Sequence, residues 1–350
     1  MKPTVSISYL IRLGLLSTLL VACSGEKSAL QSWQHSPMGS AAAAFSPDKR
    51  FVLVADADAS AKLWDLETGR IRYSWQHKSE QSGLTTDVAF STDGKIATTC
   101  ESKVILLWNM ADGKPVTRLQ FPATVRDMAV SAGGQYLLLA LQNHTAVYFD
   151  VAANQVRYIF EHDGGPVNSP VNQSINTVAL SSNGRWALTG GDDHTARLWD
   201  LHTGKQLRQW QHGNAVNLVA FGPQNDYVVT SAGNDQTRVW GISSGEEIAV
   251  LNTSPVPVDG PWGDFPVFKT TTTAIGFSSD NRFIVTGHPN REICTWRAHD
   301  GKNLACWQVP QRDALKPGVV LQAVTFDARG QFIYSEASNG LAQKWPFQHD

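Results

Sequence analysis

An acidic run at residues 56–61, DADASA, places two carboxylates two positions apart, a spacing found in calcium-binding loops. The run holds Asp56 and Asp58 but has neither the central glycine nor the closing glutamate of an EF-hand loop. A turn between two strands is therefore the favoured interpretation. The sequence also has no stretch with the spacing of a zinc-protease, CxxC, nucleophile-elbow or phosphate-loop motif. We expect no catalytic residue, no metal ligand and no cofactor.

Two cysteines have the spacing for a covalent bond to each other. Cys294 and Cys306 flank HDGK (299–302), a sequence typical of a hairpin turn, and would then face each other across two paired strands. An exported protein meets an oxidising compartment, in which such a disulfide persists. A register that differs by one residue would leave two buried thiols instead.

The N-terminus has the pattern of an export signal. An apolar run over 13–22, LGLLSTLLVA, follows Lys2 and Arg12 and is shorter than the about 20 residues of a membrane-spanning helix. It ends in LVAC, Leu20 to Cys23, which resembles the lipobox of bacterial lipoproteins. The resemblance implies a signal peptide over 1–22, lipid attachment with palmitate at Cys23, and a tether over 23–28. The alternative is an ordinary signal peptide that ends near a cysteine.

The residue after this cysteine and the balance of charge bear on location and partners. Ser24 stands where lipoproteins retained at the inner membrane tend to have aspartate, so the resemblance implies a lipid-anchored protein on the periplasmic side of the outer membrane.

The chain has 29 Lys and Arg against 31 Asp and Glu, without blocks of one sign. A nucleic-acid partner is not expected, because such a protein needs a basic surface.

The chain repeats one pattern seven times. KLWDLETGR (62–70) aligns with RLWDLHTGK (197–205), and an equivalent aromatic residue recurs every 41 to 56 residues. These aromatic residues are Trp64, Trp108, Phe149, Trp199, Trp240, Trp296 and Trp345. Each follows a short alternating apolar stretch with a polar turn, such as AAFSPD at 43–48. Four short strands in each unit indicate the blade of a β-propeller.

These motifs resemble the WD-repeat family of β-propellers over residues 29–347. The resemblance implies an all-β, seven-bladed propeller with four antiparallel strands per blade, in one domain over 29–350. It also implies a hydrogen-bonded set inside a blade, for which the best match is His162, Thr189, Asp193 and Trp199. A catalytic His–Asp pair is the alternative, but a buried indole and a buried imidazole need such partners for structural reasons. Two further sets match less well, His35 with Asp58 and Trp64, and His212 with Thr230, Asp235 and Trp240.

Counting along the repeats predicts how the ring closes. Eleven residues after each of the other landmarks lies a large apolar residue of a fourth strand, whereas the count from Trp345 passes position 350. SWQH at 32–35 has the fourth-strand pattern but no blade before it. We therefore expect residues 28–34 to pair with the strand around Trp345 and complete the last blade, which removes an open strand edge.

The inserted stretches between blades indicate where a partner binds. The longest, 252–273, contains Trp262, Phe265 and Phe268 among prolines and glycines, and aromatic anchors in a stiff loop suit a protein-binding hot spot. The same aromatics could instead fold over the blade and seal it. Because WD-repeat proteins mostly scaffold assemblies, the resemblance implies a non-catalytic scaffold that binds an unidentified protein through the face with these loops.

Two other functions are kept as alternatives. One is an enzyme or small-ligand sensor that uses the central channel, whose expected mouth holds five polar residues. They are Asp87, Arg126, Asp127, Asn176 and Asn217. The other is an accessory role in envelope or outer-membrane assembly, by loose resemblance to other lipoprotein propellers.

Overall fold

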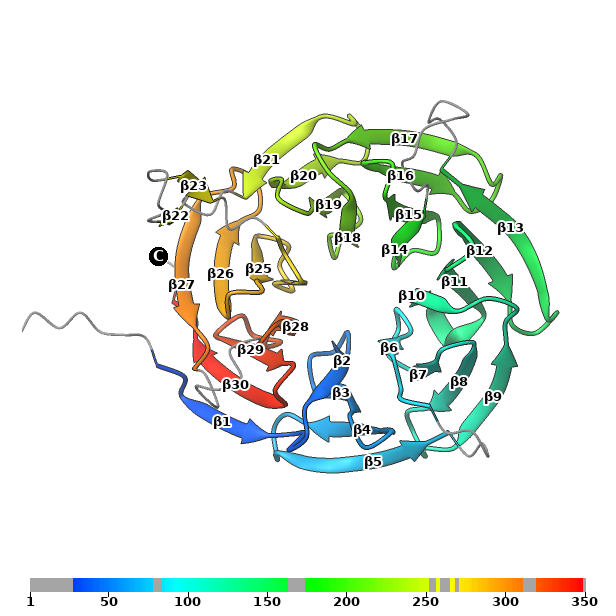
Figure 1. Cartoon of the computed structure of the whole chain (residues 1–350), viewed down its shortest axis with the longest axis horizontal. Coiled ribbons are helices and arrows are strands. Elements are labelled where there is room, and N and C mark those ends of the chain that lie inside the picture. Colours follow the sequence, from blue (N-terminus) through cyan, green and yellow to red (C-terminus); the bar gives the residue numbers. More distant parts are fainter. Residues whose placement is uncertain are drawn as a thin grey trace, which may run out of the picture.

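The computed structural model describes residues 28–77, 83–162, 174–251, 271–310 and 319–348, and the backbone of 256–258 and 265–267. Within these ranges, seven four-stranded antiparallel sheets form the blades of a closed ring (Figure 1). The prediction of an all-β, seven-bladed propeller is confirmed. The one helical element in the described part is a 3-10 turn, η1 (Ala132–Gly134). A helix long and apolar enough to cross a bilayer does not occur among the described residues.

Each of the first six blades consists of four consecutive strands. Blade 1 contains β2 (Ser40–Phe45), β3 (Phe51–Asp56), β4 (Ser60–Asp65) and β5 (Arg70–Gln76). Blade 2 contains β6 (Asp87–Phe90), β7 (Ile96–Glu101), β8 (Val104–Asn109) and β9 (Pro115–Gln120). Blade 3 contains β10 (Val125–Val130), β11 (Tyr136–Leu141), β12 (Thr145–Asp150) and β13 (Gln155–Glu161). Blade 4 contains β14 (Ile175–Leu180), β15 (Trp186–Gly191), β16 (Thr195–Asp200) and β17 (Gln206–Gln211).

The remaining blades follow the same order. Blade 5 contains β18 (Val216–Phe221), β19 (Tyr227–Ala232), β20 (Thr237–Gly241) and β21 (Glu247–Leu251). Blade 6 contains β24 (Ala274–Phe277), β25 (Phe283–Gly287), β26 (Glu292–Arg297) and β27 (Asn303–Gln308). Between these two blades, β22 (Val256–Val258) pairs with β23 (Phe265–Val267) in a small separate sheet. The first strand of each blade lies at the axis and the fourth at the rim (Figure 1).

Blade 7 takes its outermost strand from the beginning of the described chain. It contains β28 (Leu321–Phe326), β29 (Phe332–Ala337), β30 (Leu341–Pro346) and then β1 (Gln31–Gln34). β1 is antiparallel to β30, with Trp33 opposite Ala342, and Leu30 N donates to the carbonyl of Lys344 at 2.7 Å. The predicted closure of the ring is confirmed. Leu30 and β1 are called the clasp below.

A recurring Ser-x-Asp or Ser-x-Asn sequence builds the turn between the first and second strands. In blade 1 the Ser46 hydroxyl donates to Asp48 at 2.6 Å and accepts from Phe51 N at 2.9 Å. The same arrangement recurs at Ser91, Ser181 and Ser278. Side chains therefore satisfy backbone donors that the turn leaves unpaired, which is why these short polar residues favour turns.

The apolar core lies between neighbouring blades. One cluster joins Ile96 and Leu107 of blade 2 to Leu137 and Leu139 of blade 3, all of them buried. The second strands β3, β7 and β19 are buried along their whole length because they are covered on both faces. This packing holds the first strands in a fixed ring around the axis, and these strands position the candidate site.

Candidate functional site: the upper face and the axial channel

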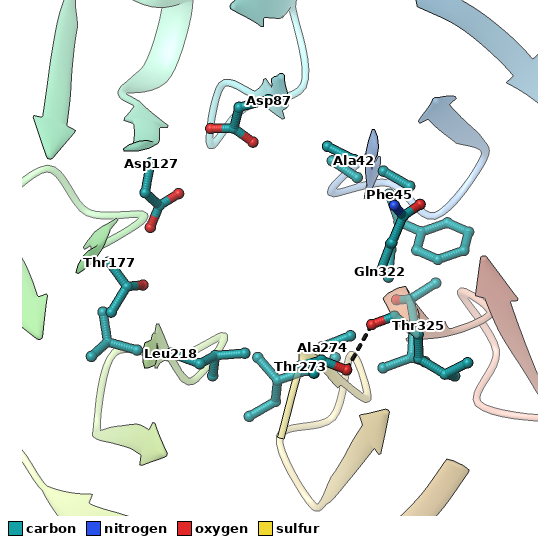
Figure 2. Close-up of a pocket in the computed structure, with 18 of the residues that line it drawn as sticks. Ala42, Phe45, Asp87, Asp127, Thr177, Leu218, Thr273, Ala274, Gln322 and Thr325 are labelled. Carbon is teal, nitrogen blue, oxygen red and sulfur yellow. Dashed lines mark hydrogen bonds between the residues drawn. The ribbon is translucent and has the colours of Figure 1, made fainter. Parts of the chain in front are cut away.

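The first strands of the seven blades surround an axial channel with a cavity volume of about 700 Å³ (Figure 2). We call the end of the disc at which these strands begin the upper face. The opposite end, at which they finish, is the lower face. Met38, Leu84 and Val320 lie just before β2, β6 and β28 and therefore belong to the upper face.

β-bulges direct polar side chains to the upper mouth of the channel. The register shifts by one residue at Arg126, Asn176 and Asn217, and a bulge turns its extra side chain away from the ladder. Arg126 Nη1 donates to Asn176 Oδ1 at 3.0 Å, and Asn176 Nδ2 donates to Asp192 at 2.6 Å. The polar mouth predicted from these residues is thus present and internally hydrogen-bonded.

Asp87 and Asp127 point toward the axis from neighbouring blades (Figure 2). The Asp127 carboxylate accepts from Met128 N at 2.9 Å and, across the blade boundary, from Val178 N at 2.7 Å. The Asp87 carboxylate accepts from Val88 N at 2.8 Å, and its second oxygen is buried without a hydrogen-bond partner in the described part of the chain. Asp127 therefore joins blade 3 to blade 4 at the channel wall.

Burial dominates the electrostatics of this pair. Removal from water raises the pKa of Asp127 to about 6, although the amide of Val178 opposes the shift. Burial and the nearby charge of Asp127 also raise the pKa of Asp87 well above its usual range. A hydrogen bond from the Thr177 side chain to the Asp127 carboxylate also opposes the rise in the pKa of Asp127.

A lysine lies at the lower end of the channel. Lys49 Nζ donates to the carbonyl of Phe277 and to Thr325 Oγ1, both at 2.8 Å, and so connects blade 1 to blades 6 and 7. Burial lowers its pKa to about 8, against the attraction of Asp327. The lysine thus acts as a cross-link between blades.

The upper face also exposes large apolar side chains. Met38 is 81% exposed, Leu84 55% and Val320 36%. They stand at the start of blades 1, 2 and 7, which are consecutive around the ring, while Arg126, Asn176 and Asn217 belong to blades 3, 4 and 5. The upper face therefore has an apolar sector beside a polar sector.

Most of the loop predicted to bind a partner lies outside the described residues. Trp262 and Phe268 are not described, and of Phe265 only the backbone is, which pairs with Val258 in the β22–β23 sheet. The hot-spot hypothesis for these three residues stays a prediction. The proposed lipid attachment site, Cys23, also lies outside the described residues.

The hydrogen-bond set predicted for blade 4 is assembled around one hydroxyl. Thr189 Oγ1 lies 2.7 Å from His162 Nε2 and accepts from the Trp199 indole at 2.9 Å. His162 Nδ1 lies 2.9 Å from Asp193 Oδ1, so a neutral ring protonated at Nδ1 satisfies both neighbours. Burial alone would raise the pKa of Asp193, but hydrogen bonds from His162 and Thr195 outweigh it and lower that pKa to about 2. His162 and Thr189 are at most 1% exposed, so the set holds the blade together and does not face a substrate.

Two other blades carry comparable sets. His212 Nε2 lies 2.8 Å from Thr230, which accepts from the Trp240 indole at 2.7 Å, and Asp235 lies 3.1 Å from His212 Nδ1. The shorter spacing before Trp240 therefore does not exclude this aspartate. Blade 2 has an equivalent set of His77, Thr99 and Trp108, which the sequence analysis did not predict. Its signal was present, since His77 closes the second SWQH.

Blades 6 and 3 have other residues in the place of this hydrogen-bond set. In blade 6 the Trp296 indole donates to Thr286 at 2.8 Å, and the imidazole 2.9 Å from this hydroxyl is His288, from the turn after the second strand. Sequence alignment to the histidines at the ends of outer strands could not find it. In blade 3 all partners are apolar, and Phe121 and Phe149 pack edge to face with ring centroids 5.1 Å apart.

In blade 1 the predicted partial set is not assembled. His35 stacks on Trp64 at 4.3 Å, but His35 Nδ1 pairs with Glu336 of blade 7 at 2.8 Å. The Trp64 indole nitrogen has no hydrogen-bond partner in the described chain, because Val54 stands where blade 4 has a threonine hydroxyl. Asp58 instead bonds Ser60 and ion-pairs with Lys62 in the turn at DADASA.

The two spaced cysteines face each other across β26 and β27. Cys294 and Cys306 are directly opposite in the strand register and form a disulfide with an S–S length of 2.05 Å. Cys294 is buried and Cys306 exposed. Cys100 is a buried free thiol, and burial raises its pKa to about 12, which makes it unreactive at neutral pH.

Comparison with known proteins gives repeat-level similarity. The family described as WD domain, G-beta repeat matches residues 28–65 and 157–200. The chain is 22% identical over 215 residues to Protein tipD of Dictyostelium discoideum, which covers 59% of the chain and 33% of that protein. It is 26% identical over 216 residues to GID complex subunit 7 of Schizosaccharomyces pombe, with 59% and 40% covered. It is 27% identical over 191 residues to eukaryotic translation initiation factor 3 subunit I of Drosophila willistoni, with 52% and 57% covered. The matched segments make up 33% to 57% of the length of these eukaryotic proteins. These matches do not test the resemblance of residues 20–23 to a bacterial lipobox.

Proposed function

We propose that this WD40-repeat propeller is a non-catalytic scaffold that binds a protein partner through its upper face while a lipid on Cys23 holds it at the periplasmic side of the outer membrane. The observation that carries the binding proposal is the exposure of Met38, Leu84 and Val320 on three consecutive blades. Exposed apolar side chains gathered on one face mark interaction sites more often than scattered ones do.

The neighbouring polar sector supports a protein rather than a membrane as the ligand of this face. Protein interfaces combine an apolar centre with a polar, hydrogen-bonding rim. Arg126, Asn176 and Asn217 provide that rim, and arginine is enriched in such interfaces. A partner that covers the apolar sector would reach these groups across the mouth of the channel.

The cellular location rests on the sequence LVAC and on the disulfide. Cys294 and Cys306 form a bond that persists in an exported protein and is rare in a reducing cytosol. Multiple acyl chains on Cys23 would anchor the protein stably, since a single chain gives only marginal membrane binding.

Site-specific photo-crosslinking tests the binding face. A photoreactive amino acid at Met38 or at Leu84 should crosslink to the same protein in the envelope, while the control position Ile159, 59% exposed on the rim strand β13, should not. The double variant Met38→Asp with Leu84→Asp should lose co-purification of that protein and keep its melting temperature. Equal crosslinking from Ile159, or retention of the partner by the double variant, contradicts the proposal.

Substitution of the lipobox cysteine tests the anchor. Cys23→Ser should abolish incorporation of a palmitate analogue and move the protein into the soluble periplasmic fraction, because the proposed acylation needs this cysteine. A Cys23→Ser protein that stays in the outer-membrane fraction would show that another feature holds it there.

A further inference from the structure

The clasp fixes the position from which any N-terminal anchor departs. Gln31 pairs with Lys344, near the end of β30, and Leu30 N donates to the carbonyl of the same lysine. Ala29 packs against the apolar cluster that joins blades 6 and 7. Because β30 ends at the lower face, Ala29 lies at the lower face, at the edge of blade 7. Any segment before Ala29 therefore departs from this edge.

The length of the preceding segment limits where an anchor can reach. From Cys23 to Ser28 the chain has five residue steps, which extend at most about 18 Å in any conformation. The disc is as thick as its strands, and seven residues such as those of β13 span about 20 Å. An anchor at Cys23 cannot pass the rim and still insert in a bilayer that lies against the upper face.

From these two limits we propose that the lower face, at the edge of blade 7, lies against the lipid bilayer and that the upper face points away from it. This inference rests on the proposed lipid attachment at Cys23. It goes further by assigning a membrane-facing surface and a partner-facing surface to the same disc.

The side chains of the clasp favour contact through the lower edge over contact through the rim. Gln31, Ser32 and Gln34 are exposed along β1, so the rim of blade 7 presents amides and a hydroxyl. Leu30, at the lower end of this strand, is 54% exposed. A leucine beside an acyl anchor gains free energy by entering the interface between headgroups and acyl chains, whereas the polar rim gains nothing there.

Fluorescence quenching by nitroxide-headgroup lipids tests this orientation. The lipidated full chain is reconstituted in phosphatidylethanolamine–phosphatidylglycerol vesicles with one introduced cysteine that carries a fluorophore. Arg329→Cys and Val320→Cys form a matched pair, because both are exposed in blade 7 and lie just beyond the two ends of β28. The introduced cysteine is the reactive one, since Cys100 is buried and the other thiols are bridged or acylated.

Quenching at Arg329→Cys should be several-fold stronger than at Val320→Cys. In a chain with about 20 glycine and serine residues inserted after Ser24, the tether reaches about 27 Å, beyond the disc thickness, and the difference should shrink. Equal or stronger quenching at Val320→Cys with the native tether overturns the orientation while leaving the lipid anchor intact. A protein that does not float with the vesicles overturns both this inference and the anchor.

Discussion

Replacing Thr189 by valine should destabilise blade 4 out of proportion to the size of the change. The two side chains have nearly the same shape, so the substitution leaves the packing in place and removes only the hydroxyl. That hydroxyl is the common partner of His162 Nε2 and of the Trp199 indole. Both groups are buried, and the substitution would remove the hydrogen bond that each of them makes with Thr189 Oγ1.

The size of the effect follows from counting those two groups. A buried polar group that loses its partner costs about 1–3 kcal/mol, so Thr189→Val should lower the free energy of unfolding by about 2–6 kcal/mol. A surface substitution would change it by about 0.5 kcal/mol or less. Val54→Thr in blade 1 is the converse, since it offers an acceptor to the unpartnered indole of Trp64 and should stabilise the protein by about 1 kcal/mol.

Urea denaturation followed by tryptophan fluorescence and by circular dichroism measures both changes. The control is a triple variant that imitates the apolar blade 3, in which His162→Phe and Trp199→Phe accompany Thr189→Leu. It removes the imidazole, the hydroxyl and the indole together, and Asp193 keeps its bonds from Thr195 and Arg197. The variant should therefore recover part of the lost stability. A Thr189→Val protein within about 0.5 kcal/mol of the native one would refute the reasoning that buried partners hold the blade.

Three further changes test other parts of the fold. Gly340→Ala should lower the melting temperature far more than Gly330→Ala. Both glycines have positive φ, but a Cβ at Gly340 would lie 1.9 Å from a carbonyl oxygen, whereas a Cβ at Gly330 would meet nothing within 4 Å. Equal shifts of the melting temperature in calorimetry would contradict this. Asp193→Asn should cost about 2 kcal/mol at neutral pH, since a pKa depressed to about 2 contributes stability that is present above about pH 4 and is lost as the pH falls toward 2. Urea titrations at several pH values should show the difference between the two proteins narrowing on acidification, and a constant difference would count against it. Reduction of the bond between Cys294 and Cys306 should lower stability by about 2–4 kcal/mol, and dithiothreitol should leave a double serine variant unaffected.

The repeat spacing was sufficient to predict the ring, its seven blades and the clasp. Each blade is one local unit, so short-range patterns fix it, and the fourth-strand pattern of SWQH identified the strand that closes blade 7. Contacts that no repeat motif encodes could not be found in this way. The bond from Val178 N to Asp127 joins blade 4 to blade 3, and the pairing of His35 with Glu336 joins residues 301 positions apart in the sequence.

Sequence patterns also cannot predict a contact that is kept but made by a residue at a different position of the repeat. His288 serves the Trp296 set from a turn where blade 4 has a glycine, so the alignment that located His162 passes over it. The exposure of Met38, Leu84 and Val320 likewise depends on how three blades sit side by side. Sequence patterns report burial along one strand, whereas these features arise between strands.

The clasp also has a consequence for the order of events during biosynthesis. Its side-chain bond from Gln343 to Ser32 joins positions 311 residues apart, so the ring remains open until almost all of the described chain has been made. Contacts this distant in sequence form slowly, and an unpaired strand edge is a template for foreign chains. Two newly made copies can exchange their first strands before either ring has closed. Rapid closure after synthesis is therefore as much a requirement of this architecture as its final stability.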